Sequence, residues 1–517
     1  MPASSEVIIE IDTGALRGRT VPGSPGVLVR EFLGVPYAAP PIGPLRFRPP
    51  QPPARWSGVR DALAFAPAPP QAEEAWSQIP LPRDHPMDED CLALNIWAPA
   101  RTEAPAPVMV WFHGGGYRVG GSMYPSTYGA HLAAAGVVVV SVGYRLGALG
   151  FAAHPDLTDE SGACGNWGLL DQRSAMAWVQ QHIAAFGGDP DRVTIMGESA
   201  GGSAVALHLC ASTGHGLFHR AILQSAAPKV DDTARAAEQV ERLVAELDLP
   251  DVRSLRDVPA ERLLAAQVTL EGPGSLMVFY PTIDGAFFDG EPFEMLARRA
   301  CDVPVLWGTN LDEWRQQAAA DRHLATFGPE ALDRRLERHF GTGWVELRDV
   351  YARARESRGA PSTPADLWVA IFGDAYFRLV THRLAAALSA AGATTYAYLL
   401  TWESADPALG ACHMLDIPFV FGTHADPEIA SFTGTGPGAD TLATTMMGAW
   451  VAMAATGNPS TDRLGPWPPY DEERRATMLL GPRCQVVDAP FEAERDVLER
   501  VVPAGSAGVR LRPAGAR

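Results

Sequence analysis

One stretch near the middle of the chain constrains the fold more than any other. An apolar run over residues 193–196 leads into Gly197-Glu198-Ser199-Ala200-Gly201, and small and apolar residues continue to position 207. This order predicts a strand, a sharp turn and a buried helix, with the serine exposed at the end of the strand. Glycines two positions before and two after the serine are required because side chains there would collide across the turn. The alternative is a glycine-rich turn that contains an incidental serine.

Other apolar runs predict the rest of a sheet. They are nearly continuous, which is typical of strands that are buried on both faces of a mostly parallel sheet and covered by helices. Residues 169–186 carry apolar side chains at helical spacing and end at a pair of glycines. We therefore predict an α/β fold with a central, mostly parallel sheet flanked by helices. The predicted buried strands are residues 108–112, 137–142, 193–196, 221–224, 303–307 and 395–400.

The amino-terminal part of the chain has a different character. Short alternating runs within residues 6–32 predict a small antiparallel meander. Residues 34–56 are rich in proline, which rules out most regular structure and predicts extended chain laid over the body of the protein. Residues 62–87 are also rich in proline, and we expect them to form a mobile surface loop near the mouth of a pocket.

The segments between the later strands are longer than simple connections. Residues 230–300 and 315–390 predict helical insertions that form a lid or a pocket wall. Because no linker interrupts the series of strands, we expect a single domain over residues 1–502. The last segment, residues 503–517, is rich in Gly, Ala and Arg, and its composition predicts a disordered tail.

Composition and charge limit the classes of partner that the protein is expected to bind and the cellular compartment in which it is expected to occur. The formal net charge of −18 and the absence of basic clusters argue against a surface for nucleic acid or anionic membrane. The chain has no basic region followed by an apolar stretch at its start and no apolar window long enough to span a membrane, so we expect a cytoplasmic protein. Six cysteines without paired spacing predict free thiols and no zinc site. Lys229 is the only lysine, which indicates, with the abundant Ala, Gly and Pro, a GC-rich bacterial gene.

A serine exposed in this way can attack an acyl group if its partners follow other strands. Such a reaction requires a base, an acid that orients the base, and N–H donors for the oxyanion. The donors are suggested by His113-Gly114-Gly115-Gly116, which directly follows strand 108–112, since glycines let the backbone approach a substrate closely. The N–H groups of Gly115, Gly116 and Ala200 would form a hole with three donors. A flexible turn is the alternative interpretation.

Two later strands lead to candidates for the acid and the base. Strand 303–307 leads to Asp312 and Glu313, and the local sequence does not decide between these two carboxylates. Strand 395–400 leads to His413, which follows the serine and both acids in chain order. His424 is the weaker candidate for the base.

Further motifs occur in the order in which one known family carries them. Besides the two glycine motifs they are Phe32-Leu33-Gly34-Val35-Pro36-Tyr37-Ala38, Glu89-Asp90-Cys91-Leu92, Gly165-Asn166 with Leu170-Asp171-Gln172, and Phe186-Gly187-Gly188-Asp189-Pro190. With these motifs the sequence resembles the type-B carboxylesterases, the α/β-hydrolase family that also contains cholinesterases and bacterial para-nitrobenzyl esterases. The match extends over residues 7–495, so the resemblance implies an α/β-hydrolase fold for the whole domain.

The resemblance implies a role for each matching position. Ser199 would be the nucleophile and His413 the base. The family prefers glutamate as the acid, which favours Glu313 over Asp312. The implied oxyanion donors are Gly115, Gly116 and Ala200.

Residues around these positions also match the family or depart from it. Glu198 is implied to lie beside the protonated form of His413, although a buried structural acid is the alternative. Ser225 resembles a serine that supports the nucleophile, the acid and the base in the family. Pro69 replaces the cysteine expected to pair with Cys91, so we expect a free thiol at Cys91. Trp314 replaces the usual glycine after the acid, which would stiffen that loop or narrow the pocket. The resemblance also implies two structural ion pairs, Arg46 with Glu89 and Arg145 with Asp171.

The implied reaction is hydrolysis of an uncharged, small-molecule carboxylic ester through an acyl-enzyme, without metal or cofactor. Two alternatives remain open: the same residues acting on an amide, carbamate or lactone, or a binding protein on this fold without catalysis. The sequence does not predict an oligomeric state. Candidate pocket residues are Tyr117, Met123, Met277, Phe279, Phe372, Met414 and Phe421.

Overall fold

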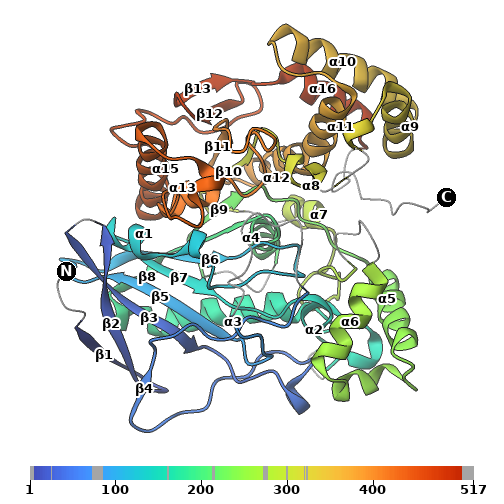
Figure 1. Ribbon diagram of the computed structural model, residues 1–517. Coiled ribbons are helices and arrows are strands. Elements are labelled where there is room, and N and C mark those ends of the chain that lie inside the picture. Colours follow the sequence, from blue (N-terminus) through green and yellow to red (C-terminus); the bar gives the residue numbers. More distant parts are fainter. Residues whose placement is uncertain are drawn as a thin grey trace.

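In the computed structural model, one sheet of 13 strands runs through the described part of the chain (Figure 1). The structure describes residues 5–503 except 25, 73–84, 160–161, 212–215, 272–277, 299–300, 320 and 322–323. The strands are β1 (Glu6–Ile11), β2 (Gly14–Ser24), β3 (Val27–Pro36), β4 (Val59–Asp61), β5 (Ala93–Pro99), β6 (Ala106–Phe112), β7 (Val138–Val142), β8 (Gly188–Glu198), β9 (Arg220–Gln224), β10 (Val305–Asn310), β11 (Thr395–Leu400), β12 (Ala476–Leu480) and β13 (Gln485–Asp488).

The centre of the sheet is parallel, as the sequence predicts. Neighbouring strands from β7 through β6, β8, β9, β10 and β11 to β12 all pair in parallel. Antiparallel strands extend both edges: β1, β2, β3 and β5 on one side and β13 on the other. The predicted amino-terminal meander is confirmed, but it is not a separate unit, because β3 pairs with β5 and so continues the main sheet.

Alternate side chains of the central strands enter two different cores. In β6, Val108, Val110 and Phe112 belong to one buried cluster, whereas Met109 and Trp111 belong to another on the opposite face. Because both faces are covered, every residue of this strand is buried, which explains its continuous apolar sequence. The apolar runs predicted as strands therefore all lie in the sheet, and each predicted end is within five residues of the observed one.

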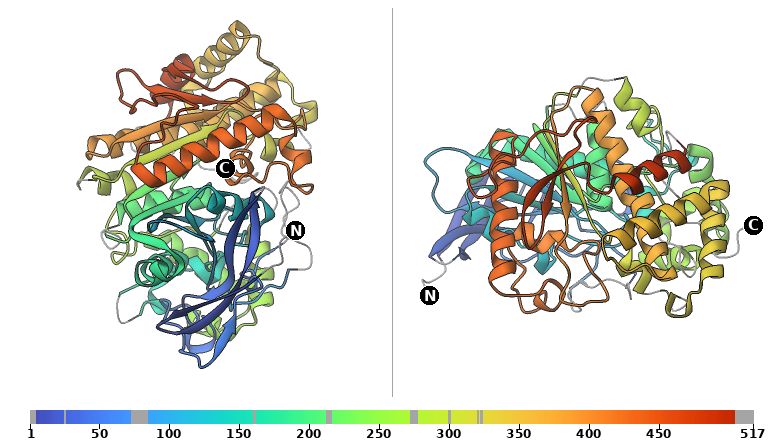
Figure 2. Two further views of the ribbon diagram at one scale, coloured as in Figure 1. Left: turned by 90° about the vertical axis from the view of Figure 1, so that its left-hand side faces the viewer. Right: turned by 90° about the horizontal axis from the view of Figure 1, so that it is seen from above.

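Helices cover both faces of the sheet (Figure 2). Helices α3 and α4 contribute to the core that contains Val110, and α1, α13 and α15 contribute to the core that contains Trp111. The helices are α1 (Ala130–Ala134), α2 (Gly147–Phe151), α3 (Trp167–His182), α4 (Ala200–Cys210), α5 (Thr233–Glu246), α6 (Ala260–Glu271), α7 (Pro292–Ala297), α8 (Arg315–Ala319), α9 (Pro329–Phe340), α10 (Trp344–Ser357), α11 (Pro364–Gly373), α12 (Leu379–Ala390), α13 (Asp416–Phe421), α14 (Ala430–Thr433), α15 (Pro437–Thr456) and α16 (Glu492–Val501).

The predicted insertions are helical, and they occupy two places. Helices α5 and α6 lie at one end of the molecule, and α9, α10 and α11 lie at the other end beside α16 (Figure 1). The second group surrounds a separate aromatic core that includes Trp314, Trp368 and Phe372. A π-helical turn, Asp374–Arg378, joins α11 to α12 within this group.

The segment predicted as extended chain, residues 34–56, begins with the end of β3 and has almost no other regular structure. Residues 37–56 contain no regular element other than the short 3-10 turn Gly43–Leu45. Of the predicted mobile loop over residues 62–87, residues 73–84 lie outside the described residues, as do residues 504–517 of the predicted tail.

Two buried ion pairs fix the extended segment to the body of the protein. Arg145 binds Asp171 through two hydrogen bonds of 2.8 and 2.6 Å, and its remaining nitrogen donates to the carbonyl of Arg48 at 2.8 Å. Arg46 pairs with Glu89 in the same bidentate way. Both ion pairs were implied by the family resemblance.

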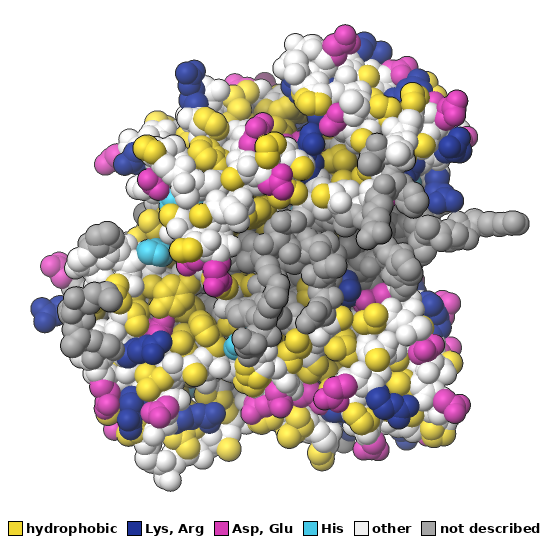
Figure 3. All heavy atoms as spheres, viewed as in Figure 1, with side chains coloured by type: hydrophobic (Ala, Val, Ile, Leu, Met, Phe, Trp, Pro, Cys, Tyr) yellow, Lys and Arg dark blue, Asp and Glu magenta, His cyan; other side chains and the backbone are white. Residues whose placement is uncertain are grey.

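The surface and the cysteines agree with the predictions from composition. All six cysteines are free, including Cys91. On the face shown in Figure 3, acidic and basic side chains are interspersed, and the basic ones form no continuous area among the described residues. Within the described segments, no helix has the length and apolarity needed to cross a bilayer.

Candidate active site

The predicted strand, turn and helix are present around Ser199. Strand β8 ends at Glu198 and helix α4 begins at Ala200, and Ser199 between them has φ 56° and ψ −120°. A Cβ atom on Gly201 would lie 2.0 Å from the carbonyl oxygen of Phe112, and one on Gly197 would lie 2.4 Å from the backbone of Gly201. Both glycines are therefore required, and they let the turn present a strained, partly exposed serine at the amino end of a helix.

The glycine loop after β6 lies directly against this serine. A Cβ atom on Gly114 would lie 3.1 Å from the Cβ of Ser199. The next two residues, Gly115 and Gly116, have φ 105° and 64°, a conformation that favours glycine. The N–H groups of Gly115, Gly116 and Ala200 donate to no residue that the structure describes. The three predicted donors are thus free to bind an oxyanion.

Two later strands bring Glu313 and His413 together. The Nδ1 atom of His413 lies 2.6 Å from Oε2 of Glu313. The other carboxylate oxygen of Glu313 accepts hydrogen bonds from the hydroxyl of Ser225 at 2.6 Å and from the backbone N–H of Asn310 at 2.7 Å. Because a carboxylate accepts and does not donate, His413 carries its proton on Nδ1 and leaves Nε2 free to accept another.

The two rival candidates lie elsewhere. Asp312 accepts a hydrogen bond from the N–H of Ala411 at 3.1 Å and lies 3.4 Å from Arg315. The Nε2 atom of His424 pairs with Asp440 at 2.9 Å. The geometry therefore favours Glu313 and His413, which were the residues preferred from the family resemblance.

Glu198 occupies the place nearest to the free nitrogen of His413. Its Oε1 atom lies 3.1 Å from Nε2, and both side chains are buried. Within the described part of the chain, no hydrogen bond joins the hydroxyl of Ser199 to His413. Such a bond commonly tightens only when a substrate is bound. The predicted neighbour of the histidinium is therefore in contact with the imidazole.

The buried acids control the protonation of His413. Burial disfavours the imidazolium, but the carboxylates of Glu198 and Glu313 outweigh this effect and raise the pKa of His413 to about 9. Burial raises the pKa of Glu198 to about 8, against the opposing effect of His413. The ring of Phe377 lies 4.5 Å from the imidazole, centroid to centroid, and covers one of its faces. The site therefore holds a proton more firmly than a solvated histidine would.

A third buried acid, which sequence reasoning missed, lies behind the imidazole. Asp416 accepts hydrogen bonds of 2.8 Å from Gln224 and from Tyr398, and its charge adds to the rise in the pKa of His413. Burial raises the pKa of Asp416 itself. The signal in the sequence was an acidic residue three positions after the histidine, at the start of an otherwise apolar run.

The structure contradicts two of the predicted pocket residues and leaves the others as predictions. Met414 is half-buried next to His413, with φ 69°. Phe372 and Phe421 expose no side-chain surface, so the expectation that they line a pocket is wrong. Both are core residues, since Phe421 packs on Trp111 and Phe372 packs on Trp314. The other candidates are Tyr117, Met123 and Phe279, which are buried, and Met277, which lies outside the described residues.

Trp314, which follows the acid, is held firmly. Its ring lies 4.7 Å from that of Phe372 and 5.2 Å from that of Tyr376. Gly373 permits this contact, because a Cβ atom there would lie 3.2 Å from the Cβ of Trp314 and 3.6 Å from that of Glu313. The loop that carries the acid is therefore stiffened by aromatic packing, as the substitution predicted.

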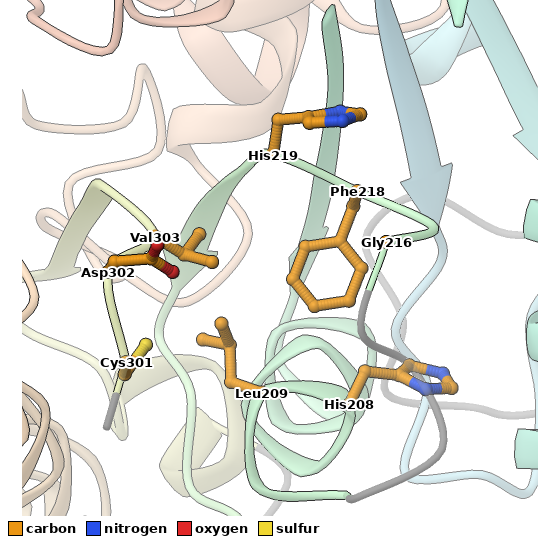
Figure 4. A pocket seen from close by; sticks show the side chains of 8 residues that line it. All are labelled: His208, Leu209, Gly216, Phe218, His219, Cys301, Asp302 and Val303. Atoms are coloured by element: carbon orange, nitrogen blue, oxygen red, sulfur yellow. The ribbon is translucent and has the colours of Figure 1, made fainter. Parts of the chain in front are cut away.

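A separate hollow of about 270 Å³ lies away from these residues (Figure 4). It is bounded by the carboxyl end of α4 and by the segments that precede β9 and β10, whereas Ser199 lies at the amino end of α4. Its lining residues are His208, Leu209, Gly216, Phe218, His219, Cys301, Asp302 and Val303. Among the residues that can be described, no group of three or more His, Cys, Asp or Glu side chains is arranged to hold a metal ion.

The chain is similar to known proteins in both sequence and structure. The model of the carboxylesterase family matches residues 5–497. The para-nitrobenzyl esterase of Bacillus subtilis (strain 168) is 34% identical over 503 residues, which are 95% of this chain and 98% of that protein. The fumonisin B1 esterase of Sphingopyxis macrogoltabida is 36% identical over 88% of this chain and 83% of its own length. The crystal structure of the carboxylesterase EST55 of Geobacillus stearothermophilus has a TM-score of 0.83 at 35% identity, covering 95% of this chain and all of that one.

The contact between Glu198 and His413 leads to a prediction. Replacing Glu198 by glutamine removes a carboxylate 3.1 Å from Nε2 and should lower the pKa of His413 by more than about one pH unit. Titration of the imidazole resonances by NMR measures this pKa. The variant Glu31→Gln is the matched control, because Glu31 is also buried but bonds to Arg19 and Trp97. An unchanged pKa in Glu198→Gln would contradict the account of the site.

Proposed function

The chain belongs to the carboxylesterase family and is a carboxylic ester hydrolase, and we propose that Ser199, His413 and Glu313 carry out the hydrolysis through an acyl-enzyme. One observation carries the proposal. The imidazole of His413, oriented by Glu313 at 2.6 Å, lies beside Glu198, the residue that immediately precedes the strained serine. These contacts support the roles of nucleophile, base and acid for the three residues, beside a loop with free N–H groups.

The reaction follows from the chemistry of these groups. The hydroxyl oxygen of Ser199 attacks the ester carbonyl while Nε2 of His413 accepts its proton, and the resulting oxyanion accepts hydrogen bonds from Gly115, Gly116 and Ala200. His413 then donates the proton to the leaving alcohol, and the carbonyl forms again as an acyl-enzyme. A water molecule repeats these steps, releases the carboxylic acid and restores the serine. Glu313 keeps the imidazole in the required tautomer throughout.

Glu198 and Ser225 support the three reacting groups in this proposal. A carboxylate beside Nε2 stabilises the imidazolium that forms when Ser199 loses its proton. The hydroxyl of Ser225 donates to Glu313 and so fixes the carboxylate that orients the base. Because neutral imidazole is the base, hydrolysis should slow as the pH falls through the raised pKa of His413.

The charges around the site favour uncharged substrates. Glu198, Glu313 and Asp416 bury three acidic groups around one imidazole, so a charged acyl or alcohol group would lose its hydration there without gaining a free counter-charge. Amides, carbamates and lactones share the same acyl transfer step and are the alternative substrates. A small-molecule ester remains the proposed partner.

The remaining proposals concern the protein as a whole. We propose a cytoplasmic bacterial enzyme without a nucleic-acid partner, on the basis of the net charge of −18 and the free cysteines. A single domain over residues 1–502 is supported by the packing of α16 against α10 and by the burial of Val502.

Removal of the nucleophile tests the proposed function. Ser199→Ala should lower kcat for a para-nitrophenyl ester by on the order of 10⁶. Ser141→Ala is the matched control, because Ser141 is a buried serine on β7 whose hydroxyl bonds to the carbonyl of Ser122. It should retain activity within about threefold, as expected for substitutions away from the chemistry. A Ser199→Ala protein with most of its activity would refute the assignment.

The choice between the two neighbouring acids can be tested in the same assay. Glu313→Gln keeps the shape of the side chain but cannot hold His413 in the required tautomer, so kcat should fall by about 10³ to 10⁴. Asp312→Asn removes a carboxylate one position away and should cost less than about tenfold, because only an ion pair with Arg315 is lost. The reverse order of effects would overturn the assignment of the acid.

A further inference from the structure

The loop that carries two of the proposed oxyanion donors is strained. Four residues in a run of six have positive φ: Gly115 (105°), Gly116 (64°), Tyr117 (56°) and Gly120 (120°). The three glycines adopt this conformation readily, but at Tyr117, which has a side chain, it costs free energy. A segment of this kind keeps its shape only if surrounding contacts impose it.

Several contacts hold the first part of the loop. The hydroxyl of Tyr144 donates to the carbonyl of His113 at 2.6 Å, and the N–H of Gly147 donates to the carbonyl of Tyr117 at 2.7 Å. Within the loop, the N–H groups of Arg118 and Val119 both donate to the carbonyl of Gly115, at 3.1 and 3.0 Å. These bonds fix the loop as far as Val119.

The far end of the loop is held by one side chain, Gln71. Its Nε2 donates to the carbonyl of Gly120 at 2.7 Å, and its Oε1 accepts from the N–H of the same residue at 2.7 Å. The second hydrogen of Nε2 is used by the carbonyl of Pro69 at 3.0 Å. The side chain is 4% exposed, so these bonds are made without competition from water. A carboxamide offers a donor and an acceptor side by side, which match the carbonyl and the N–H of one backbone residue.

Gly120 transmits this constraint to the nucleophile. A Cβ atom on Gly120 would lie 2.3 Å from Nδ1 of His113 and 2.5 Å from the carbonyl oxygen of Gly114. Gly114 in turn lies against Ser199, where a Cβ would be 3.1 Å from that of the serine. The two ends of the loop are therefore in contact, and a side chain that fixes Gly120 also fixes the glycines between them.

Gln71 is itself placed by the backbone around it. The N–H of Ala68 donates to the carbonyl of Pro86, and the N–H of Asp88 donates to the carbonyl of Ala68, both at 2.9 Å. This pairing fixes the segment that leads to Gln71 beside the residues that precede β5. The segment is the one in which Pro69 replaces the expected cysteine, so hydrogen bonds rather than a disulfide hold it here.

We propose that Gln71 is a positioning residue for ester hydrolysis, whose paired hydrogen bonds to Gly120 keep the N–H groups of Gly115 and Gly116 in place before the substrate binds. The inference rests on the proposed function of these groups as oxyanion donors. Since an oxyanion forms only during the reaction, loss of Gln71 should slow acylation and leave the binding of the ester nearly unchanged.

The test uses two variants of the full chain and one matched control. Gln71→Glu keeps the acceptor for Gly120 but cannot donate to both carbonyls in either protonation state, whereas Gln71→Met removes all three bonds without adding charge. Gln180→Glu is the control, because the Nε2 atom of Gln180 also donates to two backbone carbonyls, those of Pro190 at 2.9 Å and Leu217 at 3.0 Å, far along the sheet from Ser199. Circular dichroism and thermal melting establish that each protein is folded at the assay temperature.

Stopped-flow measurement of the para-nitrophenol burst separates the dissociation constant of the ester from the rate constant of acylation. The rate constant should fall about 10- to 100-fold in the Gln71 variants, while the dissociation constant stays within about twofold and Gln180→Glu acylates normally.

Should Gln71→Glu fail to fold, the result for Gln71→Met decides whether the proposal holds. Normal acylation in a folded Gln71 variant, or a weaker dissociation constant with an unchanged rate, would overturn the proposal. Ser199→Ala runs alongside, and its activity would refute the proposed function itself, whatever the Gln71 variants show.

Discussion

The site depends on a close contact between two pieces of backbone. The end of β6 and the turn after β8 approach until the carbonyl oxygen of Phe112 occupies the place where a side chain on Gly201 would begin. Glycines at 114, 197 and 201 make this approach sterically possible. Because the strands that bear them are parallel neighbours, their carboxyl ends meet at the same edge of the sheet. The strained serine, the free N–H groups and the amino end of α4 all take their positions from this contact.

A second principle is the concentration of buried acids around one base. Glu198, Glu313 and Asp416 are each almost fully buried, which is costly unless their charges have partners. The imidazole of His413 is the partner that Glu198 and Glu313 contact directly, while Gln224 and Tyr398 bind Asp416. This arrangement raises the pKa of His413, and it would stabilise the cation that forms when Ser199 gives its proton to the imidazole, as we propose. These three acidic side chains thus determine which fraction of His413 is protonated in the resting enzyme.

Much of this architecture could be predicted because its signals are local. Continuous apolar runs identify strands buried on both faces, and the glycines around Ser199 report a turn that no other residue permits. Glu313 was chosen over Asp312 only through the family resemblance, since both follow the same strand, and the hydrogen bond to His413 is visible only in three dimensions.

The residues that could not be identified from the sequence take their roles from contacts between segments that are far apart in the chain. Gln71 bonds to a residue 49 positions away, and Gln224 bonds to Asp416 across 192 positions. Phe421 was wrongly assigned to the pocket because its neighbours in sequence approach the site, whereas its side chain turns to Trp111 in the core. An apolar residue near a catalytic loop thus does not reveal which way it points.

The most direct test of the account is to trap the covalent intermediate. The enzyme is mixed with para-nitrophenyl acetate, quenched in acid during the burst and digested with trypsin, which releases residues 193–220 as one fragment whose serines are Ser199, Ser203 and Ser212. Tandem mass spectrometry then locates any acetyl group. The account predicts one acetyl group per chain, on Ser199. Acetylation of Ser203 or of another residue in its place, or turnover without any acetylated protein, would contradict it.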